Sequence, residues 1–304
     1  MATLLKSGVA KFRNGVFTIQ KLKETLMKYV FLLSAFVCVL AVALICWFLF
    51  ANGLPAIGKI GPFQFLLGKD WSPNNVPAFF GILPMIVGSL YVTAGAILIG
   101  VPIGIFTAVF MAKVCPKPLY KILKPAVDLL AGIPSVIYGF FGIVVLVPLV
   151  RNLFGGNGSS ILTASLLLGI MILPTVIGIT ESALRAVPEE LYEGAVALGA
   201  SHERAVFGVV LPAAKSGVMA AVVLGVGRAI GETMAVKMVA GNQALLRMPN
   251  ELLKGVRTLT ANIVLEMGDA TGLHEEALIA TGVVLFVFIL GINLLFSLLK
   301  REGT

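Results

Sequence analysis

Six long apolar segments constrain this chain more than any other feature. Each has about 20 residues or more, which is the length that a helix needs to cross the hydrocarbon core of a bilayer. Charged residues make up only 12% of the 304-residue chain and hydrophobic residues 58%, whereas a soluble domain carries about 25% charged residues. We therefore expect an all-α, polytopic membrane protein. Its six predicted spans are Tyr29–Ala51, Ile82–Met111, Leu129–Val150, Ser160–Thr180, Ala213–Ala240 and Ala277–Leu299.

The second span contains two prolines, Pro84 and Pro102. Each lacks a backbone amide donor, so we expect the helix to be broken or kinked near both. The third span includes the sequence GIPSVIYGFFG, residues 132–142. Glycines and a proline inside a span allow close helix contacts or local unwinding.

The basic residues predict the orientation of the spans. Residues 1–28 carry six of them against one acid, and we expect this segment to be cytoplasmic, with a transmembrane domain over 29–304. With that start, the inner segments carry fifteen Lys and Arg and the outer segments seven. The excess of positive charge inside places both termini in the cytoplasm. The net charge of +8 then reflects orientation and anionic lipid rather than nucleic acid.

The fifth span carries two charges, Arg228 and Glu232, in otherwise apolar surroundings. Residues four apart face the same side of a helix, so we expect a guanidinium and a carboxylate side by side. Charges at this depth usually face a bundle interior or a wet pathway, and Arg suits oxyanion recognition. The alternative is that the two charges neutralise each other and tie helices together.

Several kinds of chemistry are not indicated by the sequence. The cysteines Cys38, Cys46 and Cys115 lack metal or redox spacing, and His202 and His274 are isolated along the chain. No G-x-x-x-x-G-K-[ST] phosphate loop is present, so we do not expect this chain to bind ATP. We expect no catalytic residues, no bound metal and no cofactor.

The stretch between the fourth and fifth spans, residues 188–212, predicts a short helix rather than a loop. Pro188 suits a first helical turn, Gly199 a helix stop and Ser201 a new helix cap. Leu191, Ala195 and Leu198 lie on one face of this helix. A helix of two to three turns is too short to be stable alone, so we expect it to dock into a groove of another protein.

The spacing in this stretch resembles the EAA loop of permease subunits of bacterial ABC importers. Its matching residues are Glu193, Gly194, Ala195, Gly199, Leu211 and Pro212, with Leu198 on the same helix. The family pattern has Ala at the position of Gly194 and usually Ile at that of Val209. The resemblance implies a type I importer permease fold and a coupling helix that enters a cleft of the ATPase subunit.

Three further segments resemble the permeases of phosphate-specific (Pst) importers, and the likeness covers residues 25–300. They are GRAIGETMAVKMVAGN (227–242), LLAGIPSVIYGFFG (129–142) and FQFLLGKDWSP (63–73), and the first is closer to the C-type subunit. The resemblance implies phosphate passage at Arg228 and Glu232 in a bacterial inner membrane. It also implies three partners: an A-type permease, an ATPase dimer and an external phosphate-binding protein.

Two alternatives stay open from the residues alone. Sulfate and molybdate permeases share the EAA loop and a related fifth span, so another oxyanion is one alternative. A stand-alone ion-coupled transporter or channel is the other, but it gives no reason for a short docking helix. It would also often contain inverted repeats, which this chain does not show.

Overall fold

The computed structural model describes the backbone of residues 2–301 and the side chains of residues 23–294. It is built from helices, which confirms the predicted fold class. In the described part the exception is one antiparallel hairpin, in which β1 (Trp71–Ser72) pairs with β2 (Phe79–Phe80). The chain forms two units, Met1–Ala51 and Asn52–Thr304, and each is described by itself.

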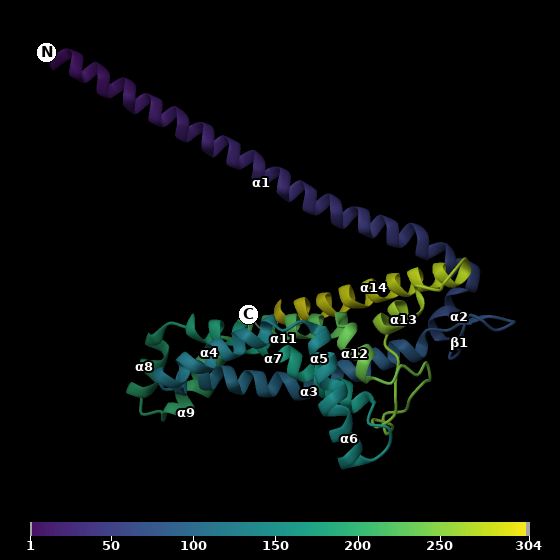
Figure 1. Ribbon diagram of the computed structural model, residues 1–304. Helices are drawn as coiled ribbons and strands as arrows, with labels where there is room; N and C mark the ends of the chain where they lie inside the picture. Colours follow the sequence, from purple (N-terminus) through teal and green to yellow (C-terminus); the bar gives the residue numbers. More distant parts are fainter. Residues whose placement is uncertain (1, 302–304) are drawn as a thin grey trace. The chain divides into compact units, whose positions relative to one another are not determined.

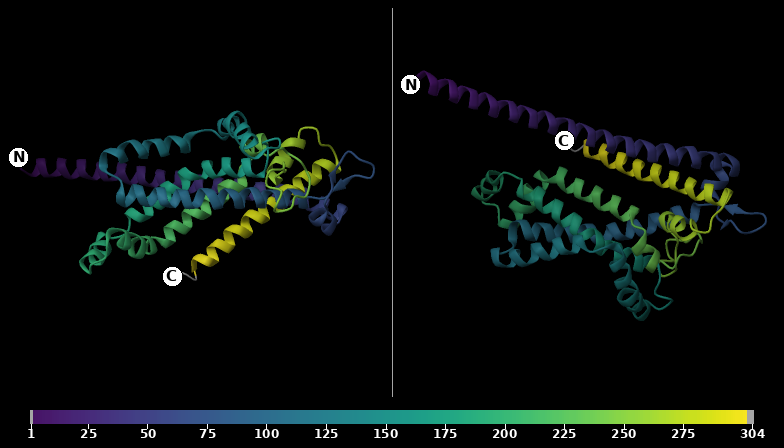
Figure 2. Two further views of the ribbon diagram at one scale, coloured as in Figure 1. Left: turned by 90° about the horizontal axis from the view of Figure 1, so that it is seen from below. Right: turned by 45° about the horizontal axis from the view of Figure 1, so that its top comes forward.

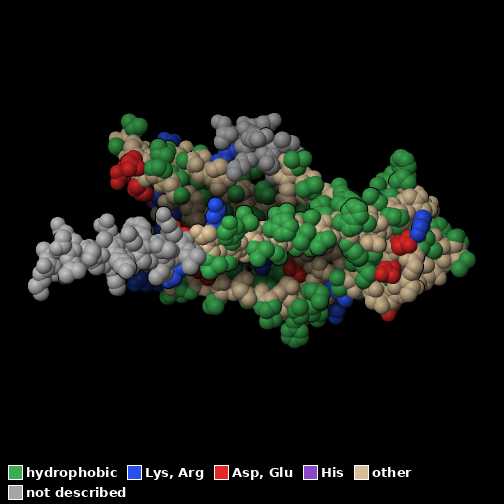
Figure 3. All heavy atoms as spheres, turned by 90° about the horizontal axis from the view of Figure 1, so that it is seen from above, with side chains coloured by type: hydrophobic (Ala, Val, Ile, Leu, Met, Phe, Trp, Pro, Cys, Tyr) green, Lys and Arg blue, Asp and Glu red, His purple; other side chains and the backbone are tan. Residues whose placement is uncertain are grey.

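The first unit consists of most of helix α1, which runs without a break from Ala2 to Ile60. The predicted span Tyr29–Ala51 lies inside this helix, whose apolar part is Lys23–Ile60. Along the described part of α1, large hydrophobic side chains such as Phe31, Phe36 and Trp47 are exposed, as the band of hydrophobic atoms in Figure 3 shows. The helix continues through residue 28, so no change of structure marks the boundary predicted there.

The second unit contains all the other elements. In chain order after the first helix they are α2 (Pro62–Leu67), the hairpin β1–β2, α3 (Leu83–Val109), the π-helix η1 (Phe110–Val114), α4 (Lys117–Gly132), α5 (Ser135–Phe141), the π-helix η2 (Gly142–Leu146), α6 (Val147–Phe154), α7 (Ile161–Arg185), α8 (Glu189–Ala197), α9 (His202–Ala205), the π-helix η3 (Val206–Val210), α10 (Leu211–Ala213), α11 (Lys215–Gly231), α12 (Met234–Val239), α13 (Leu259–Glu266) and α14 (Leu273–Arg301).

Five described helices are long and apolar enough to cross a membrane. They are Lys23–Ile60, Leu83–Val114, Ser135–Phe154, Ile161–Arg185 and Leu273–Leu294. A sixth span arises if the bent pair His202–Ala213 and Lys215–Gly231, which meet at 70°, is counted as one. The predicted number of six spans is reached in this way.

The second predicted span is not broken at either proline. Pro84 lies in the first turn of α3, where a missing amide costs no helical hydrogen bond. Pro102 lies inside α3, which continues past it, and neighbouring helices help a span to tolerate such a residue. A break is therefore absent at both prolines, whereas a kink at either one stays a prediction.

The third predicted span begins later than Leu129. Helix α4 includes the first residues of the predicted span, because it ends only at Gly132. Ile133 is extended, with φ −70° and ψ 126°, because the residue before a proline is disfavoured in the helical region. The apolar span then starts at Ser135.

Helices α3 and α7 form the most extensive helix contact in the second unit. Small residues allow their backbones to approach closely. A Cβ atom added at Gly100 would lie 2.7 Å from the carbonyl oxygen of Gly169 and 2.8 Å from Ile172. Such small-residue contacts are typical of helix packing in membranes.

Three hydrophobic clusters in the second unit lie along its length. The middle one includes Tyr138, Leu167 and Met171, and the others include Phe65 with Leu278 and Leu184 with Val206. Figures 1 and 2 show α8 and α9 at one end of this unit and the hairpin with α13 at the opposite end. These two ends are called here the coupling end and the loop end.

Candidate transport pathway and coupling sites

Arg228 lies in the last turn of α11 and is half-buried. Its Nη1 donates a hydrogen bond of 3.1 Å to Oγ1 of Thr175 on α7. The thirteen residues from Lys215 at the start of α11 to Arg228 correspond to a rise of about 20 Å, so the guanidinium lies deep in the span. A cation near a helix C-terminus is also favoured by the helix dipole.

Glu232 does not pair with Arg228, contrary to the prediction. Helix α11 ends at Gly231, and Glu232 is extended, with φ −71° and ψ 126°. Its carboxylate Oε1 accepts a hydrogen bond of 3.1 Å from the backbone N–H of Ala235, at the start of α12. The span predicted over Ala213–Ala240 is therefore divided at Glu232, and the two residues do not lie on one helical stripe.

The break at Glu232 is stabilised from both sides. A helix that ends leaves carbonyl oxygens without an intrahelical partner. Thr233 Oγ1 donates to the carbonyl oxygen of Gly231, and Thr260 Oγ1 of α13 donates to that of Glu232, both at 3.3 Å. In the described part of the chain no carboxylate forms an ion pair with Arg228. The site thus presents an uncompensated cation beside an unwound stretch of backbone.

The short helix predicted between the fourth and fifth spans is α8. Pro188 is the residue before it rather than a member of its first turn, which Glu189 and Glu190 occupy. Gly199 ends it with φ +88°, and the N–H groups of Gly199 and Ala200 donate to the carbonyls of Val196 and Ala195. This pair of bonds is a Schellman motif. Ser201 caps α9 as expected, because its side chain accepts from the N–H of Arg204.

An open cavity of about 630 Å³ lies against α8. Four of the residues predicted for coupling line it: Gly194, Ala195, Leu198 and Gly199. Leu198 is 92% exposed, although it is a large hydrophobic residue. Leu191 also lines the cavity and is exposed, and exposed apolar residues that gather beside a groove mark a surface that meets another protein.

The remaining predicted coupling residues lie outside that cavity's lining. Glu193 is exposed on α8. Leu211 begins α10 and packs against the hydrophobic cluster at the coupling end, while Pro212 follows it in the same helix. The six residues of the EAA pattern therefore lie in two places. Four are on the surface of α8 and its C-terminal turn, and Leu211 and Pro212 lie in α10, directly before α11.

Contacts with the membrane helices hold α8 in place. Lys113 of η1 forms an ion pair of 2.9 Å with Glu189 and lies 5.7 Å from the ring centre of Tyr192. The Tyr192 hydroxyl is hydrogen-bonded to Nδ1 of His202 on α9 at 2.8 Å. His202 is thus not isolated in the fold, and α8 is connected to the end of the α3–η1 helix.

Glu181 is a residue whose importance was not predicted. It is 2% exposed near the end of α7 and binds the Tyr120 hydroxyl at 2.7 Å, Arg185 Nε at 2.9 Å and Lys124 Nζ at 3.3 Å. The hydrogen bond to Glu181 raises the pKa of the Tyr120 phenol. Lys124 also pairs with Asp128 at 3.2 Å. The sequence offered one signal for the importance of Glu181: it directly follows the predicted fourth span, which ends at Thr180.

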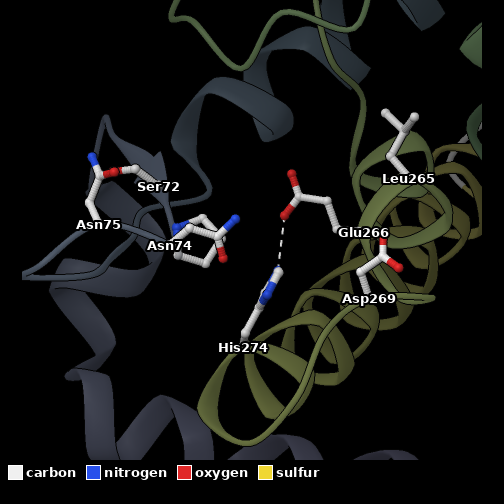
Figure 4. Close-up of a pocket in the computed structure, with 8 residues that line it drawn as sticks. Ser72, Asn74, Asn75, Leu265, Glu266, Asp269 and His274 are labelled. Carbon is white, nitrogen blue, oxygen red and sulfur yellow. Dashed lines mark hydrogen bonds and ion pairs between the residues drawn. The ribbon is translucent and has the colours of Figure 1, made fainter.

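A second unpredicted group lies at the loop end, around Glu266 of α13. Its carboxylate accepts from Trp71 Nε1 at 2.7 Å, pairs with Arg257 and lies 3.0 Å from His274 Nε2. Figure 4 shows Glu266 and His274 pointing toward each other, with Ser72 and Asn74 opposite this pair; all four residues line a cavity of about 360 Å³. His274 therefore joins the hairpin, α13 and α14, and it is not isolated either. These partners give the Glu266 carboxylate a structural role, which is to hold the elements of the loop end together.

The fold defines the class of protein. The structure resembles that of the MetNI methionine ABC transporter, with a TM-score of 0.59 at 20% identity, covering 73% of this chain and 96% of the other. This likeness concerns the fold, which is that of the membrane subunits of type I ABC importers.

Sequence comparison gives the family. Residues 100–302 match the family of binding-protein-dependent transport system inner membrane components, and this chain belongs to that family. It is 38% identical to the probable ABC transporter permease protein YqgH of Bacillus subtilis, over 93% of this chain and 91% of that protein. It is 39% identical to the phosphate transport system permease protein PstC of Mesorhizobium japonicum, over 79% of this chain and 78% of that protein. A multi-pass inner-membrane transporter subunit follows from these findings.

Proposed function

We propose that this chain is the PstC-like permease subunit of an ABC importer that moves inorganic phosphate into the cytoplasm. One observation carries the proposal: the similarity to the PstC phosphate permeases extends over most of the chain and includes the segment around Arg228. A half-buried guanidinium without an ion-pair partner is suited to an oxyanion, because its planar donors can bind two oxygens at once.

Three partners belong to this function. A cytoplasmic ATPase dimer supplies the energy, since this sequence has no phosphate loop of its own. A second, A-type permease completes the pathway, and an external binding protein delivers phosphate on the outer side of the membrane. Both termini, and the domain boundary drawn at residue 28, lie on the cytoplasmic side, as the distribution of basic residues indicates.

Arg228 binds the passing phosphate in the proposed mechanism. Thr175 orients its guanidinium through the hydrogen bond to Nη1. Glu232 has a different role from the one predicted: it does not offset the charge at close range but caps α12 and so maintains the unwound backbone beside Arg228. An unwound stretch within a span offers a hydrogen-bonding surface where it lines a cavity. Binding at such a site must stay weak enough for release.

In the coupling step, α8 transmits the motion of the ATPase subunits to the membrane helices. ATP-driven closure of the ATPase dimer pushes on the face formed by Gly194, Ala195 and Leu198, which is open to a partner. Lys113 and Tyr192 transmit this push to η1 and thereby to α3. The permease bundles then rock, and the central pathway opens alternately to the two sides. The other predicted coupling residues form α8 and its connection to the fifth span: Glu193, Gly199, Leu211 and Pro212.

The test is the ATPase activity of the purified, reconstituted assembly with its binding protein. We expect stimulation by phosphate and not by sulfate or molybdate. Stimulation by sulfate or molybdate instead would replace phosphate with another oxyanion. Purification without any ATPase subunit, together with phosphate transport in its absence, would favour a stand-alone carrier and overturn the proposal.

A further inference from the structure

A cavity of about 560 Å³ lies at the loop end, between the turn that follows α6 and the segment 241–255. The described residues that line it are polar or glycine apart from Leu253, and none of them is acidic. They are Arg151, Gly156, Asn157, Ser159, Gly241, Gln243, Arg247, Leu253, Lys254 and Gly255. Figure 1 shows these two segments side by side beyond α6, far from α8.

Backbone hydrogen bonds fix the walls of this cavity. The N–H of Ile161 donates to the carbonyl of Lys254 at 3.1 Å, and that of Leu162 donates to Leu252 at 2.9 Å. The N–H of Val256 donates to the carbonyl of Ala240 at 2.8 Å. The turn after α6 and the segment 241–255 are therefore joined at the start of α7, and the cavity is a formed feature of this end.

Two guanidinium groups in the cavity are held by neutral acceptors. Arg151 donates from Nε and Nη2 to the carbonyl of Asn157, at 3.2 and 2.9 Å. Arg247 donates from Nε to the carbonyl of Gly255 at 3.0 Å and from Nη2 to Oε1 of Gln243. In the described part of the chain neither arginine forms an ion pair with a carboxylate. Both charges are thus positioned but not neutralised.

The third cation of the cavity differs from the two arginines. Lys254 pairs with Glu251 at 2.6 Å. The hydrogen bond from Lys254, followed by that from the N–H of Met248, holds the pKa of the Glu251 carboxyl below its usual range. Glu251 therefore stays ionised at neutral pH and offsets Lys254. The charge of Arg247 also lowers the pKa of Glu251, so this carboxylate offsets part of the Arg247 charge as well. The cavity stays positive, because three cations line it and no carboxylate does.

We propose that this cavity binds a free phosphate ion before it enters the pathway at Arg228, and this inference rests on the proposed function. A phosphate supplies the negative charge that the lining of the cavity lacks, and its oxygens accept hydrogen bonds from guanidinium N–H groups. Guanidinium groups bind such oxygens through paired, charge-assisted hydrogen bonds. The cavity is open and the arginines are already anchored, so the ion binds with little reorganisation and leaves readily.

The test measures equilibrium binding of radiolabelled inorganic phosphate to the complete permease–ATPase assembly in nanodiscs of neutral lipid, without nucleotide. Gln243→Glu is the main variant, because it has nearly the shape of the original side chain, keeps an acceptor for Arg247 and adds a negative charge to the cavity. Gln64→Glu, on the exposed surface of α2 at the same end, is the matched control. A double variant, Arg151→Gln with Arg247→Gln, removes both charges.

We expect Gln243→Glu and the double variant to weaken one class of phosphate sites by about 10-fold or more, whereas Gln64→Glu binds as the unmodified assembly does. Arg228→Gln should leave this class of sites intact. Unchanged binding in both cavity variants would overturn this inference but leave the proposed function standing. An unmodified assembly that neither binds nor transports phosphate would instead overturn the proposed function.

Two other outcomes would also overturn the inference. Loss of the partner subunits on purification of the Gln243→Glu variant would make the cavity a subunit contact. Loss of co-purifying anionic lipid, with unchanged phosphate binding, would make it a lipid headgroup site.

Discussion

Replacing Gly199 with alanine is expected to uncouple ATP hydrolysis from phosphate transport. Gly199 ends α8 with φ +88°, a conformation that costs an L-residue roughly 1–2 kcal/mol. A Cβ atom added there would meet nothing within 4 Å in this chain. The expected effect within the subunit is therefore backbone strain and not a steric clash.

The strain acts on a helix with little stability of its own. Helix α8 has nine residues, and helices of this length are marginal without tertiary contacts. Its C-terminal end depends on the two hydrogen bonds made by Gly199 and Ala200. A cost of roughly 1–2 kcal/mol lowers the ratio of ordered to frayed ends by about 5- to 30-fold. Less of the population then presents Leu198 and the groove to the ATPase.

The assay is phosphate uptake into proteoliposomes per ATP hydrolysed, with the ATPase enclosed and the binding protein outside. We expect Gly199→Ala to reduce this ratio by about 5-fold or more while ATP hydrolysis continues. Gly199→Asn is the matched control, because asparagine has a larger side chain but tolerates the left-handed conformation. It should keep most of the coupling.

The uptake-to-hydrolysis ratios of the two variants show whether backbone strain at Gly199 controls coupling. A ratio for Gly199→Ala equal to that of the unmodified protein would refute the idea that the end of α8 controls coupling. A lower ratio for Gly199→Asn than for Gly199→Ala would show that side-chain size in the ATPase cleft matters instead of backbone strain.

Three further predictions concern Arg228, Thr175 and the network around Glu181. Arg228→Gln should reduce phosphate transport by at least about 10-fold with the assembly intact; normal uptake would exclude a pathway role. Thr175→Val should remove the hydrogen bond to the guanidinium and lower transport by about 10-fold, whereas Thr175→Ser should transport normally; equal rates for both would exclude positioning by the hydroxyl. Glu181→Leu should lower the free energy of unfolding by about 2 kcal/mol, because it removes the hydrogen bonds from Tyr120 and Arg185, and Tyr120→Phe by about 1 kcal/mol. Thermal unfolding in detergent checks both values, and an unchanged melting temperature for Glu181→Leu would contradict the assigned buried network.

Much of the fold follows from local patterns that the sequence displays directly. Apolar length alone predicts the spans, and the short polar stretch with Gly199 and Ser201 predicts α8 and the start of α9. These features depend on residues within a few positions of one another. The same holds for Pro134, whose effect on Ile133 ends α4, although we expected the span to begin at Leu129.

Only the tertiary structure decided how the charged residues are used. Spacing placed Arg228 and Glu232 on one helical stripe, but Thr175 of α7 binds the first, and Thr260 of α13 stabilises the break at the second. Glu181 likewise depends on Tyr120, 61 positions away in sequence. A buried polar group must find a partner wherever the fold supplies one. Helical periodicity describes a single helix, so it could not identify partners on other helices.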